Sequence, residues 1–195
     1  MFIKPLIAAL LLAASPGAFA LNLVYNPDFD TSLDGWSVSV QAGGGAYRES
    51  YFGSPDSGTL RLDAYNFGNI AEAWQCVDLH AWTDMKLDVV LRFAQNTFAG
   101  TGFYQFKLDV QDAADCGGNT LTTIYINGFG DPVPGANGST WTESSVYGTD
   151  LPAGTLSGKL YFGVAAGAAG TSGFMIDHVQ VGPLEEIFRE TFESN

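Results

Sequence analysis

Apolar and polar residues alternate along several segments of the chain. The clearest segments are 60–65, 85–93 and 104–110, where apolar side chains occupy every second position and mostly polar ones stand between them. Successive side chains of a β-strand point to opposite faces of its sheet, so a period of two predicts a strand with one buried face. We therefore expect 85–93 and 104–110 to be central antiparallel strands.

Clusters of Gly, Pro, Asn and Asp separate these segments from further candidate strands. The further strands are predicted at 21–25, 35–40, 46–52, 69–77, 120–127, 140–147, 158–165 and 173–181. No segment shows a convincing 3.6-residue repeat of an amphipathic helix. The pattern predicts an all-β fold of two packed antiparallel sheets, a β-sandwich or jelly roll.

The alternation also predicts which side chains face the core and which face solvent. The inward-facing set is Leu91, Phe93, Phe106, Leu108, Ile124, Ile126, Leu160, Phe162 and Val164. The outward-facing set is Arg92, Gln105, Lys107, Asp109, Thr123, Tyr125 and Tyr161.

The first twenty residues have the pattern of a secretory signal peptide. Lys4 precedes a short apolar run at 6–14, and Ala18 and Ala20 are the small residues that signal peptidase requires. A membrane anchor, the alternative, needs about 18 or more apolar residues, and this run is interrupted at 15–17. We expect cleavage after Ala20 and secretion to the periplasm or the extracellular space.

Length and charge restrict what the secreted part can be. Removing twenty residues from 195 leaves 175, which suits one β-sandwich domain over 21–183 with a C-terminal tail over 184–195. We expect no membrane insertion, because even the apolar stretch 160–175 is broken by glycines. Eight Lys and Arg against 21 Asp and Glu give a net charge of −13, which disfavours nucleic acid and anionic lipid surfaces as partners.

The chain contains two cysteines, Cys76 and Cys116. In an exported protein an even pair favours a disulfide over the alternatives, a metal site or a catalytic thiol. On the chain-entropy description, a bridge that closes a loop of about 40 residues stabilises the fold by roughly 4 kcal/mol.

Four short motifs resemble those of galactose-binding-like carbohydrate-binding modules. Residues 22–36 contain Asn-Leu-Val-Tyr-Asn-Pro-Asp-Phe-Asp followed by Leu-Asp-Gly-Trp, which looks like the start of such a module, and 174–181 resembles its last strand. Between them, 141–155 holds a Trp-led strand with a Pro-Ala-Gly turn. Segments 74–77 and 115–118 look like a disulfide-bearing version found in secreted bacterial proteins.

The resemblance implies a jelly roll with a structural Ca²⁺ near the junction of the first and last strands. The matching acidic positions are Asp30 and Asp177, with Asp28 as a further candidate, and carboxylate oxygens suit Ca²⁺. The chain departs from the family pattern at Asp30, where a Glu is usual, and at His178, where a second Asp is usual. The alternative is that these are solvated carboxylates of turns.

The final residues, 187–195, look like the tails that end secreted proteins of some gram-negative bacteria. An extra edge strand and a disordered end are both open for this segment.

Candidate catalytic residues are few. His80 and His178 lack the sequence context of a metalloprotease or of a serine hydrolase. Glycosidases need two carboxylates that flank a cleft, and the spacing of Glu49, Glu72 and Glu143 selects no pair. We therefore do not expect an enzyme, and a small glycoside hydrolase or lyase is the less favoured alternative.

A sugar-binding surface needs flat aromatic faces beside hydrogen-bonding side chains. The outward-facing set meets this need, and the predicted carbohydrate-binding residues are Tyr125, Tyr161, Arg92, Gln105, Asp109 and Trp74. Trp74 shares its parity with Cys76, so packing against the disulfide is the alternative role for its ring.

These observations predict an exported, non-catalytic carbohydrate-binding module whose partner is a glycan or polysaccharide. A structural or adhesive β-sandwich without sugar binding, with a protein partner at the cell surface, is the alternative.

Overall fold

The computed structural model describes residues 21–53, 58–83, 86–99, 103–127, 141–167 and 171–183. The predicted signal peptide, 1–20, and the predicted tail, 184–195, lie outside the described residues.

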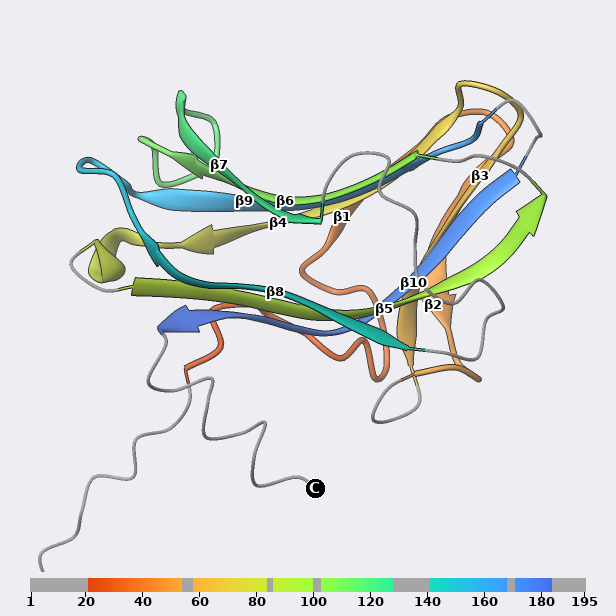
Figure 1. The fold of residues 1–195 in the computed structure, drawn as a ribbon, viewed down its shortest axis with the longest axis horizontal. Helices are drawn as coiled ribbons and strands as arrows, with labels where there is room; N and C mark the ends of the chain where they lie inside the picture. Colours follow the sequence, from red (N-terminus) through yellow and green to blue (C-terminus); the bar gives the residue numbers. More distant parts are fainter. Residues whose placement is uncertain are drawn as a thin grey trace, which may run out of the picture.

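Within the described part of the chain, ten strands form two five-stranded sheets in which every pairing is antiparallel (Figure 1). The first sheet contains, in order across it, β1 (Ser37–Val40), β4 (Ile70–Asp78), β9 (Ser157–Ala165), β6 (Phe103–Gln111) and β7 (Thr120–Asn127). The second sheet contains β2 (Gly45–Glu49), β3 (Thr59–Tyr65), β10 (Thr171–Pro183), β5 (Lys86–Ala99) and β8 (Thr142–Asp150). The chain is a two-sheet β-sandwich of the jelly-roll type, as the alternation predicts. A short 3₁₀ turn, His80–Trp82, precedes β5.

The predicted alternation of inward and outward side chains is confirmed. Every residue of the inward-facing set is buried, and every residue of the outward-facing set is partly or fully exposed. Strands 85–93 and 104–110 correspond to β5 and β6, and each lies between two neighbours in its sheet. The period of two was therefore sufficient to assign the faces of the long strands.

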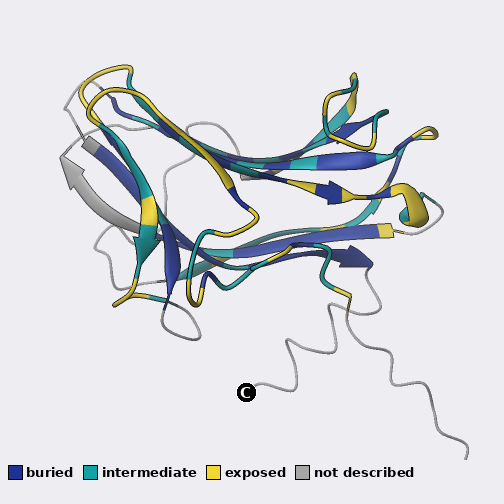
Figure 2. Cartoon of the chain, turned by 180° about the vertical axis from the view of Figure 1, so that it is seen from behind, coloured by how far each residue is buried: buried dark blue, intermediate teal, exposed yellow. Residues whose placement is uncertain are grey.

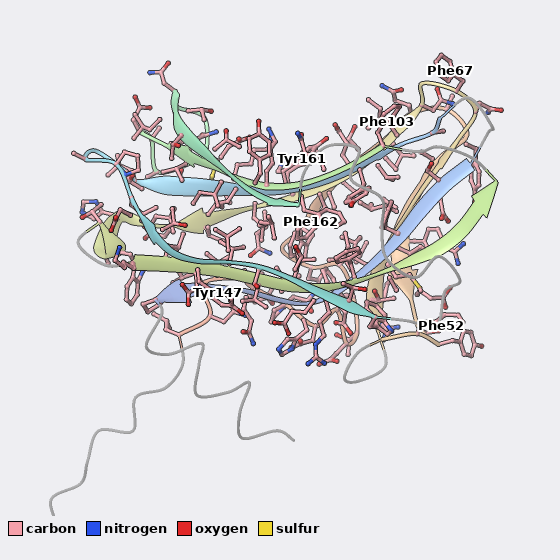
Figure 3. All side chains as sticks on the ribbon, viewed as in Figure 1. Phe52, Phe67, Phe103, Tyr147, Tyr161 and Phe162 are labelled. Atoms are coloured by element: carbon pink, nitrogen blue, oxygen red, sulfur yellow. A yellow bond between two sulfur atoms is a disulfide. The ribbon has the colours of Figure 1, made fainter. Side chains whose placement is uncertain are left out.

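Aromatic side chains join the two sheets at the centre of the sandwich. Phe162 of β9 packs edge-on against Phe106 of β6, with ring centroids 5.6 Å apart, and Phe106 packs edge-on against Phe174 of β10 at 5.9 Å. Trp36 stacks on Phe162 at 5.3 Å. Figure 3 shows Phe162 pointing between the sheets, and Figure 2 shows that buried residues dominate the strands that face each other. These contacts hold the sheets face to face.

The strand predicted at 21–25 is wrong, although this segment does lie beside β10. Its contacts with β10 include a hydrogen bond from Leu23 N to Val181 O of 2.8 Å. The side-chain amide of Gln75 accepts from Tyr25 N at 2.7 Å and donates to Tyr25 O at 2.8 Å. The backbone groups that a regular strand would offer to a neighbouring strand are therefore taken by a side chain.

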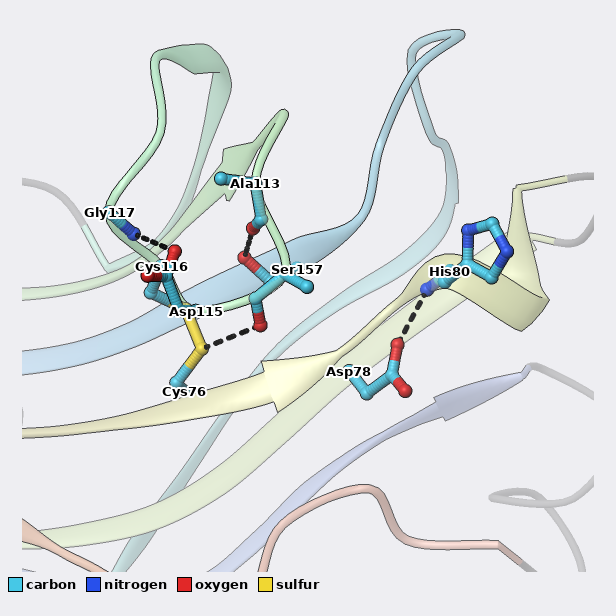
Figure 4. Close-up of a disulfide and its surroundings, with 9 residues drawn as sticks. Cys76, Asp78, His80, Ala113, Asp115, Cys116, Gly117 and Ser157 are labelled. Carbon is cyan, nitrogen blue, oxygen red and sulfur yellow. Dashed lines mark hydrogen bonds between the residues drawn. A yellow bond between two sulfur atoms is a disulfide. The ribbon is translucent and has the colours of Figure 1, made fainter.

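The disulfide between Cys76 and Cys116 is present, as predicted. It ties β4 to the turn that connects β6 and β7 (Figure 4). The same turn is held by Ser157 Oγ of β9, which donates to Ala113 O at 2.5 Å, and by Gly117 N, which donates to Asp115 Oδ1 at 3.1 Å. The bridge thus fixes a loop at one end of the first sheet.

No helix among the described residues is long and apolar enough to span a bilayer.

Replacing both cysteines, Cys76→Ser with Cys116→Ser, should lower the free energy of unfolding by about 4 kcal/mol, because the bridge closes a loop of about 40 residues and restricts the unfolded chain. Urea denaturation of the oxidised wild type and of the double variant measures the difference. Equal urea midpoints and slopes for the two proteins would contradict this role.

Candidate functional site

The outer face of the first sheet carries a row of aromatic and basic side chains that crosses its strands. Trp74 on β4 is paired in register with Tyr161 on β9, and Tyr161 is paired with Lys107 on β6. Lys107 is in turn paired with Tyr125 on β7. Since side chains at paired positions stand on the same face of a sheet, this row lies together on the side away from the core.

Tyr161 lies flat against the sheet because its neighbour two positions along β9 is a glycine. A Cβ atom placed on Gly163 would stand only 2.8 Å from both Cε1 and Cζ of the Tyr161 ring. The ring therefore occupies the space that any other side chain at 163 would fill. Figure 3 shows Tyr161 on the outer side of the sheet and Phe162 on the inner side.

A carboxylate holds the Tyr161 ring in this position. Tyr161 Oη donates to Glu72 Oε1 on β4 at 2.6 Å, and Glu72 is the register partner of Gly163. Partial burial of the phenol and the hydrogen bond to Glu72 raise the pKa of Tyr161. The hydroxyl is therefore a neutral donor at every pH at which the protein is expected to work.

A cation lies over the face of the Tyr161 ring. Lys107 Nζ lies 5.2 Å from the centroid of the Tyr161 ring and 2.7 Å from Asp109 Oδ2. Thr123 Oγ1 on β7 donates to Asp109 Oδ1 at 2.7 Å. The Tyr161 ring is thus bounded by hydrogen-bonding groups on both neighbouring strands.

A pocket of about 360 Å³ opens beside the disulfide at one end of the row. Trp74, Lys159, Asp115 and both cysteines contribute to its lining. Lys159 Nζ lies 4.9 Å from the centroid of the Trp74 ring. Trp74 thus lines an open pocket together with the two cysteines of the disulfide.

Farther along β9, a smaller hollow of about 60 Å³ is lined by Phe103, Gln105, Tyr161 and Gly163, among others. Figure 3 shows Phe103 on the same outer side of the sheet as Tyr161. The outer face thus has a hollow on each side of the central row.

The structure brings five of the six predicted carbohydrate-binding residues to one face. The five are Trp74, Gln105, Asp109, Tyr125 and Tyr161. Arg92 does not join them: it lies on β5 of the second sheet, where its Nε is 4.0 Å from Glu143 Oε2. Its placement in the site was wrong, because parity tells which side of its own strand a residue faces and not which sheet that strand joins.

The predicted site left out four residues of this face, namely Glu72, Lys107, Lys159 and Gly163. Lys107 was assigned outward but was not selected, and Glu72 shares the parity of Trp74. Both signals were present in the sequence. The role of Gly163 was not visible, because it depends on how the side chain of Tyr161 lies.

The carboxylates predicted to bind calcium have partners within the chain or point to solvent. Asp28 Oδ1 lies 3.1 Å from His178 Nδ1, and Asp177 is buried and accepts from His178 N at 2.8 Å. The Asp30 side chain is exposed, while Arg48 donates to the backbone oxygens of Phe29 and Asp30. Within the described residues, no three His, Cys, Asp or Glu side chains are grouped closely enough to hold a metal ion.

The glutamates weighed as catalytic candidates do not converge. Glu72 lies on the first sheet, and Glu49 and Glu143 lie on β2 and β8, the two opposite edges of the second sheet. His80 is exposed, and its backbone N donates to Asp78 Oδ1 at 2.9 Å. This region is drawn in Figure 4.

The solved structures that resemble this one include several carbohydrate-binding modules. One is TmCBM61 in complex with β-1,4-galactotriose, 16% identical, with a TM-score of 0.55, covering 84% of this chain and 99% of that one. Another is the CBM22-1 xylan-binding domain of Paenibacillus barcinonensis Xyn10C, 12% identical, with a TM-score of 0.53, covering 88% and 98%. The chain has the jelly-roll fold of carbohydrate-binding modules.

The same fold occurs in the enzymatically active domain of tailspike protein 4 of bacteriophage CBA120, at 17% identity and a TM-score of 0.60. The match covers 84% of this chain, which spans about a fifth (21%) of that domain. At such identities the likeness concerns the fold alone. A scan against models of known families and a search of the curated proteins find no match.

Because Asp28 and Asp177 already have hydrogen-bond partners within the chain, we expect that neither excess Ca²⁺ nor excess EDTA changes the melting temperature by more than about 1 °C. A ligand that binds only the native state would raise it by mass action. Differential scanning calorimetry in the two conditions measures this. A clear fall of the melting temperature in EDTA, reversed by Ca²⁺, would contradict this expectation and support a bound calcium ion.

Alkaline pH should destabilise the fold partly through Tyr161. Its pKa is raised in the folded state, so its contribution is fully present below about pH 10, the value for an unfolded chain, and is lost as pH rises through the folded pKa. Thermal melts at pH 9 to 11.5 should therefore decline less steeply for Tyr161→Phe than for the wild type. Equal slopes would count against the proposed environment of this hydroxyl.

Proposed function

We propose that this protein is an exported, non-catalytic carbohydrate-binding module that holds a polysaccharide on the outer face of its first sheet. The observation that carries the proposal is the Tyr161 ring, laid flat over Gly163 and fixed by Glu72, in register with Trp74. A ring held in this way offers its partly exposed surface, next to the Lys107 ammonium, without the loss of side-chain entropy that a mobile ring would suffer on binding.

The chemistry of the face suits a sugar ring. The C–H bonds on one side of a pyranose are apolar and pack on aromatic rings, and its hydroxyl groups need donors and acceptors at the edge. Glu72, Asp109 and Gln105 supply acceptors beside Tyr161, while Lys107 and Gln105 supply donors. The face carries charges of both signs, which favours a ligand that is rich in hydroxyl groups.

The register of the row suggests the direction of the ligand. Neighbouring strands are about 4.8 Å apart, so Trp74 on β4 and Tyr125 on β7, three strands away, are separated by roughly 14 Å. A chain of several sugar units laid across the strands would meet Trp74, Tyr161 and Tyr125 in turn. The fold neighbours that bind galactotriose and xylan make β-1,4-linked polysaccharides the first ligands to try.

Two further observations support the proposed export and the proposed absence of catalysis. Disulfides persist mainly in oxidising compartments outside the cytoplasm, and the Cys76–Cys116 bridge is formed. Glu72 and Asp109, carboxylates beside the row, are each engaged with neighbouring side chains instead of facing each other across a cleft. This arrangement favours binding over hydrolysis.

Affinity gel electrophoresis against β-1,4-galactan, xylan and a wider set of plant and bacterial polysaccharides tests the proposal. Wild type should be retarded by at least one of them. Trp74→Ala with Tyr161→Ala should weaken that binding at least tenfold, about 1.4 kcal/mol. Tyr147→Ala, on an edge strand of the second sheet, is the matched control and should bind like the wild type.

Gly163→Ala sharpens the test, since its methyl group would displace the Tyr161 ring without deleting it. Binding should fall in this variant too. Retardation by none of the polysaccharides would overturn the proposal in favour of a structural or adhesive domain, and binding that survives the double substitution would move the site elsewhere.

A further inference from the structure

A second tyrosine lies flat over a glycine, on the outer face of the second sheet. A Cβ atom on Gly45 would stand 3.0 Å from Cε1 and 3.3 Å from Cδ1 of Tyr47, two positions along β2. Tyr47 Oη donates to Asp63 Oδ2 on β3 at 2.8 Å. Partial burial and the Asp63 carboxylate raise the pKa of Tyr47 to about 12.

The buried carboxylate of Asp63 accepts hydrogen bonds from Tyr47, Arg61 and Tyr65 and so joins these side chains. Its side chain is 1% exposed and occupies the space above Gly173 of β10, where a Cβ atom would overlap the carboxylate. Besides Tyr47, Arg61 Nε donates to Asp63 Oδ2 at 2.9 Å and Tyr65 Oη donates at 3.4 Å. Burying an ionised carboxylate costs several kcal/mol, which such donors offset, and the result is that two tyrosine rings are anchored to one point.

The charges around Tyr47 repeat those around Tyr161. Arg61 Cζ lies 5.5 Å from the centroid of the Tyr47 ring, and its Nη1 lies 3.6 Å from Glu49 Oε2. One cation and two carboxylates, Asp63 and Glu49, thus surround this ring. Around Tyr161 the corresponding groups are Lys107 with Asp109 and Glu72.

The anchored rings remain open to solvent. Tyr47 and Tyr65 each keep 40% of their surface exposed. Aromatic rings that served only to pair strands would gain more by burying that surface, at about 25 cal/mol per Å². Rings that are immobilised and still exposed are instead prepared to receive a flat ligand.

From this repetition we infer that Tyr47, Tyr65, Arg61 and Glu49 form a second glycan-binding surface, which makes the domain bivalent for polysaccharide. The inference rests on the proposed function, because it assigns the same ligand class to the same arrangement of groups. The two surfaces lie on the outer faces of opposite sheets, so one short oligosaccharide does not bridge them, and a long or branched polysaccharide is held from two sides. Two sites on one molecule raise the apparent affinity for such a polymer by roughly 10²–10⁴-fold where the geometry permits simultaneous contact.

The experiment counts binding sites by isothermal titration calorimetry with galactohexaose and xylohexaose, the short forms of β-1,4-galactan and xylan. Three proteins are compared with the wild type: Tyr47→Ala with Tyr65→Ala, Trp74→Ala with Tyr161→Ala, and the control Tyr147→Ala on the opposite edge strand, β8. We expect two sites in the wild type and in the control, and one site in each double variant. The polymers, β-1,4-galactan or xylan, should form turbid, cross-linked complexes with the wild type and with Tyr147→Ala. Neither double variant should form such complexes.

Each outcome has a distinct meaning. A single site that disappears with Trp74 and Tyr161 would overturn the second surface and leave the proposed function intact. A single site that disappears with Tyr47 and Tyr65 would overturn both the bivalency and the first-sheet site, and absence of binding to both hexasaccharides and their polymers would overturn the inference for this ligand class.

Backbone amide NMR of the wild type tests the inference without depending on whether a variant folds. Titration of wild-type protein with the hexasaccharide should shift amide signals in two separate groups, one on β4 and β9 and one on β2 and β3. Gly45→Ala, which keeps every donor and acceptor but pushes the Tyr47 ring by a few tenths of an ångström, should weaken the second group of shifts selectively. Shifts confined to the first sheet would again overturn the inference.

Discussion

The packing of Phe162 at the centre of the sandwich determines what the first sheet presents to solvent. Its ring meets Phe106 edge-on and Trp36 face-on, so β9 cannot slide along its neighbours without emptying that position. A shift by one residue would carry Phe162 to the surface and the Tyr161 hydroxyl into the core. The loss of a buried aromatic ring typically costs about 3–5 kcal/mol. The orientation of Tyr161 is therefore a consequence of the core.

Glycines in the strands convert outward-facing tyrosines into flat surfaces. A tyrosine on a sheet ordinarily stands away from it, because the side chain two positions along fills the neighbouring space. Gly163 and Gly45 have no side chain to fill that space, and the rings of Tyr161 and Tyr47 occupy it. Each hydroxyl then reaches a carboxylate on the adjacent strand, which holds the ring. The strand loses some intrinsic stability at each glycine and gains an oriented aromatic face.

Much of the fold follows from local alternation, and its failures have identifiable causes. The pattern of β5 and β6 assigned the core-facing side correctly over 87–93 and 104–110, because every second residue there packs in the core. The segment 21–25 alternates less clearly, and the Gln75 amide takes the backbone groups of Tyr25. The acidic positions Asp28 and Asp177 were aligned by resemblance, and in the structure each of them has a hydrogen bond with His178. Short-range pattern carries no information about such partners.

The sequence by itself determined the strand periodicity, the inward and outward sets and the pairing of Cys76 with Cys116, because each depends on chain-local geometry or on a count of residues. The tertiary structure decided which strands become neighbours. Trp74, Tyr161, Lys107 and Tyr125 are far apart in sequence and meet only because β4, β9, β6 and β7 pair in that order and register. Arg92 also faces outward from its strand, but that strand, β5, belongs to the other sheet. Strand order is set by long-range packing of the core, which no single segment encodes.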